Sequence, residues 1–465
     1  MSSSTEASDG SKTPTDRGPL KPITHECAFF ETYFYTIAQF QFDHAHGFAD
    51  KERGTPDPRK PLWSGLLNSL MTFANAEKSY FAMAFIEKRM FNRTLKPVYT
   101  QLSTDLLTLI DSAAEVHDVE ALALELCKQL KRFAQARLEM IDFYEYFMKC
   151  KWSHVRNTKE IIISIQKINT MFTKDFHHPV LDPVKTGFNF ETEILTTLLQ
   201  TELKLCEWEF LESLLTLREC QNKLHAWRLL SPSNSVKDQL LASFTYKSFF
   251  MRGSKKQADT PALYQWLQLF HLHLLSKFSF YFYSTLLHGQ AASPDLKGSL
   301  TKNSIDYISK ITSFQRKTDA HSVSLVLDAA TKEKVYKGHG YFMDNTLVNA
   351  PTGINSYPSI VNIPPENVTA TAHWPNIIIM LTDRANDLNT TDKIGYSYDS
   401  RLESTYFLIK VDVRMYLVLI YKMKKKERDS YIQNFLLEMR ANLGHDKLFQ
   451  MLKPSQSKLF SYQKN

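Results

Sequence analysis

The stretch of sequence that decides the fold is residues 119–147, VEALALELCKQLKRFAQARLEMIDFYEYF. Its apolar side chains recur at alternating intervals of four and three residues, which places them on one face of an α-helix. Only Arg137 interrupts this stripe. The run from Phe188 to Leu230 repeats the rhythm without glycine or proline, and it predicts a second helix about 60 Å long. Stripes of this kind are typical of the long helices of a bundle.

The segments around these two stripes extend the helical pattern over residues 25–288. Further helices are predicted at His25–His46, Leu62–Met90, from Pro97 onward, and Ala262–Leu287, with a proline-rich connection at Asp50–Pro61. Residues 1–20 are rich in Ser, Thr, Asp, Gly and Pro, so we expect a disordered tail there. The sequence therefore predicts an N-terminal antiparallel bundle of long helices.

The pattern changes near residue 320 from helical spacing to short alternating strands. Predicted strands lie at His321–Asp328, Glu333–Lys337, Asn376–Thr382, Thr405–Lys410 and Arg414–Tyr421, between helices at Asn303–Phe314 and Ile432–Leu443. A long loop from Met343 to His373 stands where a middle helix would be expected. The order predicts an α+β domain over residues 301–453 with a small antiparallel sheet, of the roadblock or longin type. It follows a linker at 289–300 and precedes a tail at 454–465.

Composition excludes several classes of protein. A chain of 465 residues is long for a single core, so two domains are expected. Only 14 glycines argue against a doubly wound nucleotide-binding fold. The net charge of +7, from 56 basic and 49 acidic residues, is too dispersed for a nucleic-acid partner. Apolar runs are far shorter than the roughly 18 residues of a membrane span, and the five scattered cysteines indicate reduced thiols in the cytoplasm.

No motif in the sequence meets the spacing that catalysis or cofactor binding requires. Gly338 and Gly340 lack the third glycine of a dinucleotide fingerprint, because Met343 stands there. A metal-dependent hydrolase could be built from His177, His339, His373 and Asp383, but adjacent histidines diverge in direction, so a structural turn is favoured. Asp383 with Arg384 is read as a charge-satisfied turn. We therefore predict no catalytic residue, cofactor or metal.

A basic run precedes the last predicted helix and consists of Lys422, Lys424, Lys425, Lys426 and Arg428. A solvated turn is the favoured interpretation, although positive charge at a helix N-terminus is mildly unfavourable. The alternative is contact with an acidic partner or an anionic membrane surface.

Several short motifs together resemble the KICSTOR subunit 2 family. They occur in the order of that family over residues 25–454 and are, in this sequence, Phe133-Ala134-Gln135-Ala136-Arg137, Phe176-His177-His178-Pro179, Lys277-Phe278-Ser279-Phe280, Gly338-His339-Gly340-Tyr341, His373-Trp374-Pro375-Asn376, Thr382-Asp383-Arg384, Ser404-Thr405-Tyr406-Phe407 and Glu427-Arg428-Asp429-Ser430. We take His177, His178, Gly338, His339, Gly340, Tyr341, His373, Trp374, Pro375, Asp383, Arg384, Lys424, Lys425 and Lys426 as candidate partner-binding or signature residues.

The resemblance implies a non-enzymatic adaptor, since the family has no known catalytic residues. It implies membership of the KICSTOR complex with kaptin, an FG-GAP-repeat protein and a very large scaffold protein. That complex holds the GATOR complex, which acts on Rag GTPases, at the lysosome, and so restrains mTOR signalling when amino acids are scarce. The protein would then be cytoplasmic and recruited to lysosomes through partners, and a role in cilium formation is also associated with the family. The rival hypothesis is a trafficking adaptor that docks small GTPases outside KICSTOR.

Overall fold

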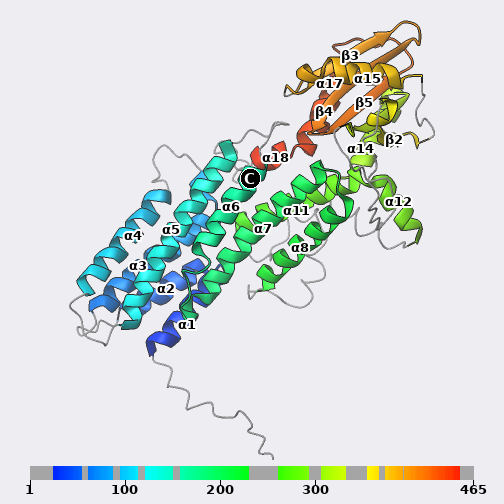
Figure 1. Cartoon of the computed structure of the whole chain (residues 1–465). Coiled ribbons are helices and arrows are strands. Elements are labelled where there is room, and N and C mark those ends of the chain that lie inside the picture. The colour runs from blue at the N-terminus through cyan, green and yellow to red at the C-terminus, as the bar shows by residue number, and fades with distance from the viewer. Residues whose placement is uncertain are drawn as a thin grey trace, which may run out of the picture.

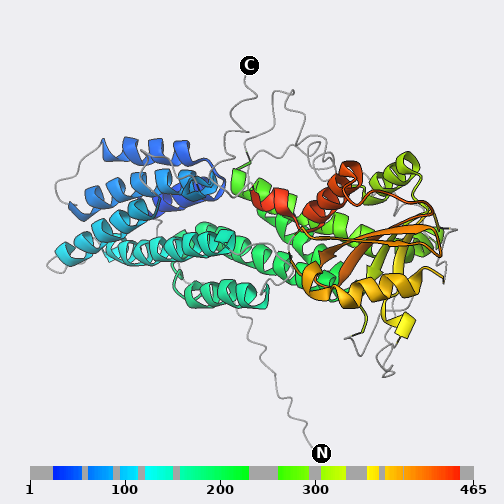
Figure 2. The ribbon, with the colours of Figure 1, turned by 90° about the horizontal axis from the view of Figure 1, so that it is seen from above.

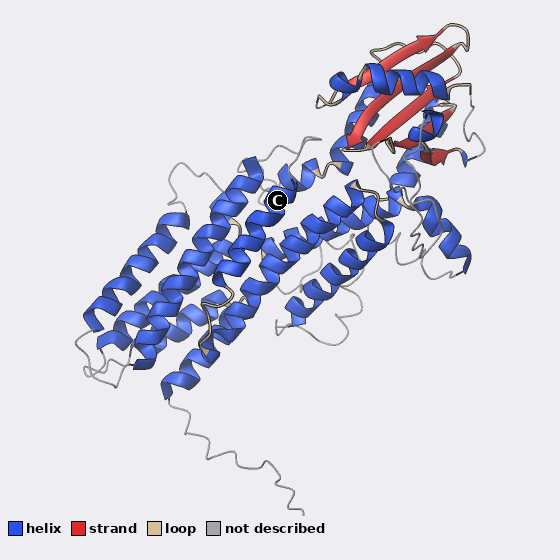
Figure 3. Ribbon diagram, in the orientation of Figure 1, coloured by secondary structure: helices blue, strands red, loops and turns tan. Residues whose placement is uncertain are grey.

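The computed structural model describes residues 25–54, 61–86, 95–113, 121–149, 158–229, 260–292, 305–330, 353–365, 372–390 and 392–450. The molecule is elongated: helices make up its longer part, and a five-stranded sheet lies at the other end (Figure 1, Figure 3). The predicted tails, the second predicted strand (Glu333–Lys337) and the segment Gly338–Tyr341 lie outside the described residues.

The helical part contains most of the chain. Its helices are α1 (His25–Ala38), α2 (Phe42–Arg53), α3 (Pro61–Phe81), α4 (Leu95–Ser112), α5 (Ala121–Lys149), α6 (Thr158–Phe172), α7 (Asp182–Cys206), α8 (Phe210–Leu229), α11 (Ala262–Tyr281) and α12 (Tyr283–Ala292), with short 3₁₀ turns at Ala84–Ile86 and Pro179–Leu181. The stripe on α5 is buried over its described length, from Ala123 to Phe147, as its spacing predicted. α12 extends into the predicted linker at 289–300.

Two predicted helices are each broken in two. The predicted helix His25–His46 is divided at Phe40, and the predicted helix Phe188–Leu230 is divided at Trp208, so the predicted 60 Å helix does not form. Both break residues adopt left-handed backbone, with φ of 62° at Phe40 and 61° at Trp208. At Trp208 the N–H of Glu209 bonds to the carbonyl of Lys204, at 3.0 Å, in the pattern that usually ends a helix at glycine. Aromatic residues at both positions gave no stop signal.

The second break turns α8 back along α7. Lys223 of α8 lies 3.1 Å from Glu193 of α7, which fixes the two helices as an antiparallel pair. The ring of Trp208 stacks on Phe282 with centroids 4.4 Å apart. This contact offsets part of the strain of left-handed backbone at a residue with a side chain.

The sheet contains β1 (Ser322–Leu327), β2 (Ser359–Ile363), β3 (Ile394–Asp399), β4 (Ser404–Asp412) and β5 (Met415–Tyr421). Its order is β2-β1-β5-β4-β3 with antiparallel pairing throughout. The predicted hairpin of β4 and β5 is confirmed. β2 lies inside the segment predicted to be a long loop, and β3 was not predicted at all.

The predicted central strand Asn376–Thr382 is wrong, because these residues belong to helix α15 (Trp374–Asp383). A continuous apolar run does not distinguish a buried strand from a buried helix. Pro375 stands in the first turn, where its fixed φ favours a helix start. α15 and the short α16 (Ala385–Leu388) therefore supply the middle helix that was predicted to be missing.

The sheet separates two layers of helices (Figure 2). One face, with Tyr406, Leu408 and Val418, packs against Trp374 and Ile377 of α15. The opposite face packs against α14 (Tyr307–Thr318) and α17 (Ser430–Leu443), and its apolar side chains continue without a break into the core of the helical part. None of the described helices combines the length and apolar content that crossing a lipid bilayer requires.

Candidate functional site

The helical part and the sheet meet at a group of polar side chains, which we call the junction cluster; all are buried except Cys206, which is half-buried. Its members are Glu202 and Cys206 near the end of α7, Lys277 and Tyr281 on α11, Asp412 at the end of β4, and His445, which follows Gly444 just after α17. Each of these elements has an apolar face that packs into the common core, and this packing brings their polar ends together.

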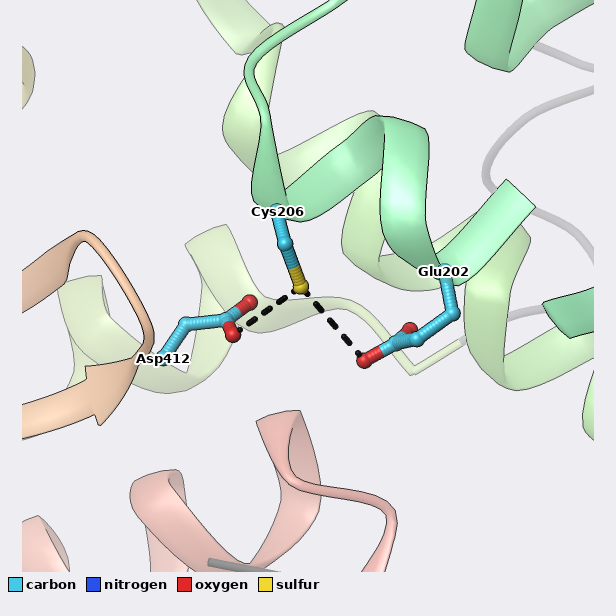
Figure 4. Close-up of side chains that lie close together, drawn as sticks. All are labelled: Glu202, Cys206 and Asp412. Atoms are coloured by element: carbon cyan, nitrogen blue, oxygen red, sulfur yellow. Dashed lines mark hydrogen bonds between the residues drawn. The ribbon is translucent and has the colours of Figure 1, made fainter. Parts of the chain in front are cut away.

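Lys277 occupies the centre of the junction cluster. Its Nζ lies 2.9 Å from Glu202 Oε1 and 2.6 Å from Asp412 Oδ2. The Tyr281 hydroxyl donates a 2.7 Å hydrogen bond to Asp412, and His445 Nε2 lies 3.0 Å from Glu202 Oε2. Cys206 Sγ donates to Asp412 Oδ1 at 3.2 Å (Figure 4). One ammonium group thus joins a carboxylate of the bundle to a carboxylate of the sheet.

The environment keeps the ion pairs charged and the thiol neutral. Burial alone would lower the pKa of Lys277, but the facing carboxylates of Asp412 and Glu202 raise it well above its ordinary value. Burial also opposes ionisation of Glu202, yet Lys277 and His445 hold its pKa well below the usual range. Burial, followed by the charge of Asp412, raises the pKa of the Cys206 thiol. A thiol that stays protonated is a poor nucleophile.

Three members of the cluster have the donor types of a metal site. Ligand atoms of Glu202, Cys206 and Asp412 all lie within 4.8 Å of one another (Figure 4). The ammonium of Lys277, however, already bonds both carboxylates and supplies the positive charge that a metal ion would bring. The residues therefore fit an ion-paired joint between two parts of the chain better than a metal centre.

A second buried network ties the helices of the bundle together. Arg137 of α5 donates from Nε and Nη2 to the two carboxylate oxygens of Glu77 on α3, at 2.9 and 2.8 Å, and from Nη1 to Glu191 of α7 at 2.6 Å. The hydroxyls of Tyr99 and Tyr80 donate to these carboxylates at 2.7 and 2.6 Å. The lone charge in the apolar stripe was the signal for this network, but the sequence did not reveal its partners.

The candidate residues His177 and His178 form a structural turn. The side chain of Gln129 on α5 accepts from the backbone N–H of His178 at 3.0 Å and lies 3.3 Å from His177 Nε2. His178 Nδ1 in turn accepts from the N–H of Val180 at 3.3 Å. Burial lowers the pKa of His178, which favours the neutral ring that this bond requires.

His373, Trp374 and Pro375 begin α15 on the outer face of the sheet. His373 Nδ1 lies 2.7 Å from the hydroxyl of Tyr406, and Trp374 Nε1 donates to the Tyr357 carbonyl at 2.9 Å. The exposed residues Asp383 and Arg384 lie at the other end of α15, about 15 Å away at 1.5 Å per residue.

The hydrolase hypothesis required His177, His373 and Asp383 to converge, and they do not. His177 belongs to the bundle, whereas His373 and Asp383 lie at opposite ends of α15. The proposed fourth residue, His339, lies outside the described residues. Sequence reasoning missed the residues that do converge, since Glu202, Lys277 and Asp412 are separated by 75 or more positions.

A family model described as "KICSTOR complex C12orf66 like" matches residues 19–458. The chain belongs to this family. Two similar proteins are both named KICSTOR subunit 2. The protein from Danio rerio is 34% identical over 447 residues, covering 94% of this chain and 97% of its own length. The protein from Xenopus laevis is 33% identical over 444 residues, covering 93% of this chain and 97% of its own length.

In this member of the KICSTOR complex C12orf66 like family, several motifs that carry the resemblance serve the interior. Arg137 lies at the centre of the bundle network, and Lys277 lies at the centre of the junction cluster. The hydroxyl of Tyr406 is hydrogen-bonded to the ring of His373. The basic residues Lys424, which is exposed, and Lys425, which is half-buried, place their ammonium groups over the rings of Tyr398 and Tyr421 at 5.2 and 5.0 Å.

Proposed function

We propose that this chain is a non-enzymatic scaffold subunit of a KICSTOR complex. The similarity to proteins named KICSTOR subunit 2 carries this proposal, since each match covers 97% of the length of that protein. The buried polar groups support it, because their charged side chains form ion pairs between helices and strands of this chain. Rigid joints of this kind suit a protein that presents a fixed surface to several partners.

Within that role, the chain acts with kaptin, an FG-GAP-repeat protein and a very large scaffold protein to hold the GATOR complex at the lysosomal surface. It thereby restrains mTOR signalling when amino acids are scarce, contacts Rag GTPases only indirectly, and contributes to cilium formation. The C-terminal module is of the roadblock or longin type. The element order α-β-β-α-β-β-β-α, with helices on both faces of a five-stranded sheet, supports that interpretation.

Affinity purification of the full chain from amino-acid-starved cells tests the complex. We expect the three other KICSTOR subunits and GATOR to be recovered with it. A matched pair of variants sharpens the test: Lys277→Met disrupts the joint between bundle and sheet, whereas Lys167→Met changes an exposed lysine of α6. We expect only Lys277→Met to lose partners, since a scaffold with a loosened joint no longer presents both surfaces together.

The second candidate is a trafficking adaptor that docks small GTPases outside KICSTOR. The α+β module favours it, because both roadblock and longin modules are adaptor folds. Recovery of small GTPases without the large scaffold protein would support this candidate and contradict the first. Elemental analysis of the purified chain for zinc, iron and manganese is an independent check on the hydrolase hypothesis, whose residues His177, His373 and Asp383 do not converge.

A further inference from the structure

The end of the sheet that lies opposite the junction carries an unusual concentration of positive charge. β4 runs from this end to the junction over nine residues, about 27 Å, and β5 returns from the junction to this end at Tyr421. Directly after β5 come five basic residues within seven positions, which we call the distal basic ribbon: Lys422, Lys424, Lys425, Lys426 and Arg428. With Glu427 included, the segment has a net charge of +4.

The backbone of the ribbon is held in place. The hydroxyl of Thr405 at the start of β4 donates to the carbonyl of Met423 at 2.7 Å and accepts from the N–H of Lys425 at 3.0 Å. The hydroxyl of Tyr396 on β3 donates to the carbonyl of Lys425 at 2.9 Å. The charges are therefore displayed on an ordered ribbon that continues the sheet, so binding a partner costs little backbone entropy.

Many surface lysines elsewhere form ion pairs with carboxylates, as at Lys78, Lys96, Lys128, Lys159, Lys204, Lys223, Lys310 and Lys393. The ribbon instead places several basic side chains next to one another without such partners among the described residues. Within the described part of the chain, no ion pair joins any of the five ribbon side chains to a carboxylate. Two nearby carboxylates are engaged otherwise: Asp429 caps α17, and Asp399 accepts from Asn376. The positive field also reaches buried groups, since burial and then Lys422 lower the pKa of His373.

Apolar side chains project from the same end. Met423 stands between Lys422 and Lys424 and is 46% exposed, and Leu402, on the β3–β4 turn beside it, is 36% exposed. Lysine is a strongly hydrated point charge, whereas bidentate recognition of a protein carboxylate favours arginine. A row of lysines around single exposed apolar side chains suits a diffuse anionic surface with an apolar layer beneath it.

We propose that the distal basic ribbon docks this chain directly on a membrane that contains anionic lipid. The lysines lie against the headgroups, and the side chain of Met423 enters the boundary of the acyl layer. The elongated molecule then meets the bilayer at one end and leaves the bundle free for other proteins (Figure 1). This inference does not rest on membership of a KICSTOR complex, because the purified chain alone tests it.

The experiment is co-sedimentation of the purified full-length chain with vesicles of phosphatidylcholine, with and without phosphatidylserine. We expect binding only to the phosphatidylserine vesicles, and release as the salt concentration rises. A lysine near an anionic surface contributes a factor of about five in affinity. The combined change Lys422→Glu, Lys424→Glu and Lys426→Glu should therefore weaken binding at least a hundredfold.

A matched variant distinguishes the effect of the ribbon on vesicle binding from the effect of the net charge of the protein. Lys51→Glu, Lys167→Glu and Lys174→Glu together make the same charge change at exposed lysines of the bundle, and should leave vesicle binding within about twofold. Circular dichroism checks that both variants are folded. Met423→Ser should weaken vesicle binding without changing the salt dependence of that binding. Met423→Leu should bind vesicles as the wild type does.

Three results would overturn the proposal. Equal loss of binding in both triple variants would mean that only net charge matters. Equal binding to vesicles without phosphatidylserine would remove the role of the anionic headgroup. Failure to bind vesicles, together with ribbon-dependent binding to a poly-glutamate peptide, would assign the ribbon to an acidic protein partner instead.

Discussion

Replacing Arg137 with methionine should destabilise the bundle far more than any surface change of the same kind. The guanidinium makes three charge-assisted hydrogen bonds of 2.6–2.9 Å to Glu77 and Glu191, and all three side chains are at most 1% exposed. Removing the cation leaves two buried carboxylates without their counter-charge. Breaking a buried ion pair on one side costs about 3–5 kcal/mol, so we expect a loss of about 4 kcal/mol in the free energy of unfolding.

Urea unfolding of the full chain, followed by far-ultraviolet circular dichroism, measures this loss. The matched control is Arg132→Met on the same helix, whose partner Asp175 lies 2.6 Å away at a half-exposed site. A pair of that kind contributes about 0–1 kcal/mol. Adding Glu77→Gln and Glu191→Gln to Arg137→Met should recover part of the loss, since the uncompensated charges are then gone. If Arg137→Met shifts the unfolding midpoint no more than Arg132→Met, the reasoning about the buried charge is refuted.

Three further outcomes are expected. Lys277→Met should cost about 3–5 kcal/mol, because Glu202 and Asp412 lose their shared ammonium, and a thermal midpoint equal to that of the wild type would contradict this. The folded-state pKa of Glu202 is depressed, so its contribution to stability is present above its ordinary value of 4.5 and is lost as pH falls below it. Acid titration of unfolding midpoints should therefore show a steeper decline in the wild type than in Glu202→Gln. Phe210→Asp should lower stability by about 2 kcal/mol, since its ring packs 5.5 Å from that of Phe278, whereas Phe210→Leu should cost under half as much in the same measurement.

The helix and strand elements show where local pattern was sufficient. The α5 stripe repeats with the helical period over eight turns, so it was predicted correctly. The strands of the β4–β5 hairpin were also predicted, although both are buried along their whole length and lack a period of two. The run at Ile377 to Leu381 has neither period, and it was assigned to a strand although it forms a helix. Phe40 and Trp208 adopt left-handed backbone that is usually left to glycine, so the helix breaks had no signal in residue type.

The sites show where local pattern carried too little information. His177 and His178 attracted attention as adjacent histidines, yet their ring nitrogens fix a turn against Gln129 and Val180. The residues that converge most closely, Lys277 and Asp412, were predicted only to be in a helix and near a hairpin turn. Charged residues of these types are common on protein surfaces, and nothing in their spacing distinguishes a buried pair from an exposed one.

The sequence by itself determined the helical bundle, the position of the change to strands, the hairpin next to the last helix, and the family resemblance. These follow from periodicity and residue order, which are properties of short segments. The tertiary structure alone decided that Arg137 meets Glu77 and Glu191, that Lys277 joins the bundle to the sheet, and that the lysines after β5 lie at the end of the sheet opposite that joint. The physical reason is that the free energy of a charge depends on its burial and on its partners, and packing sets both for residues far apart in the chain.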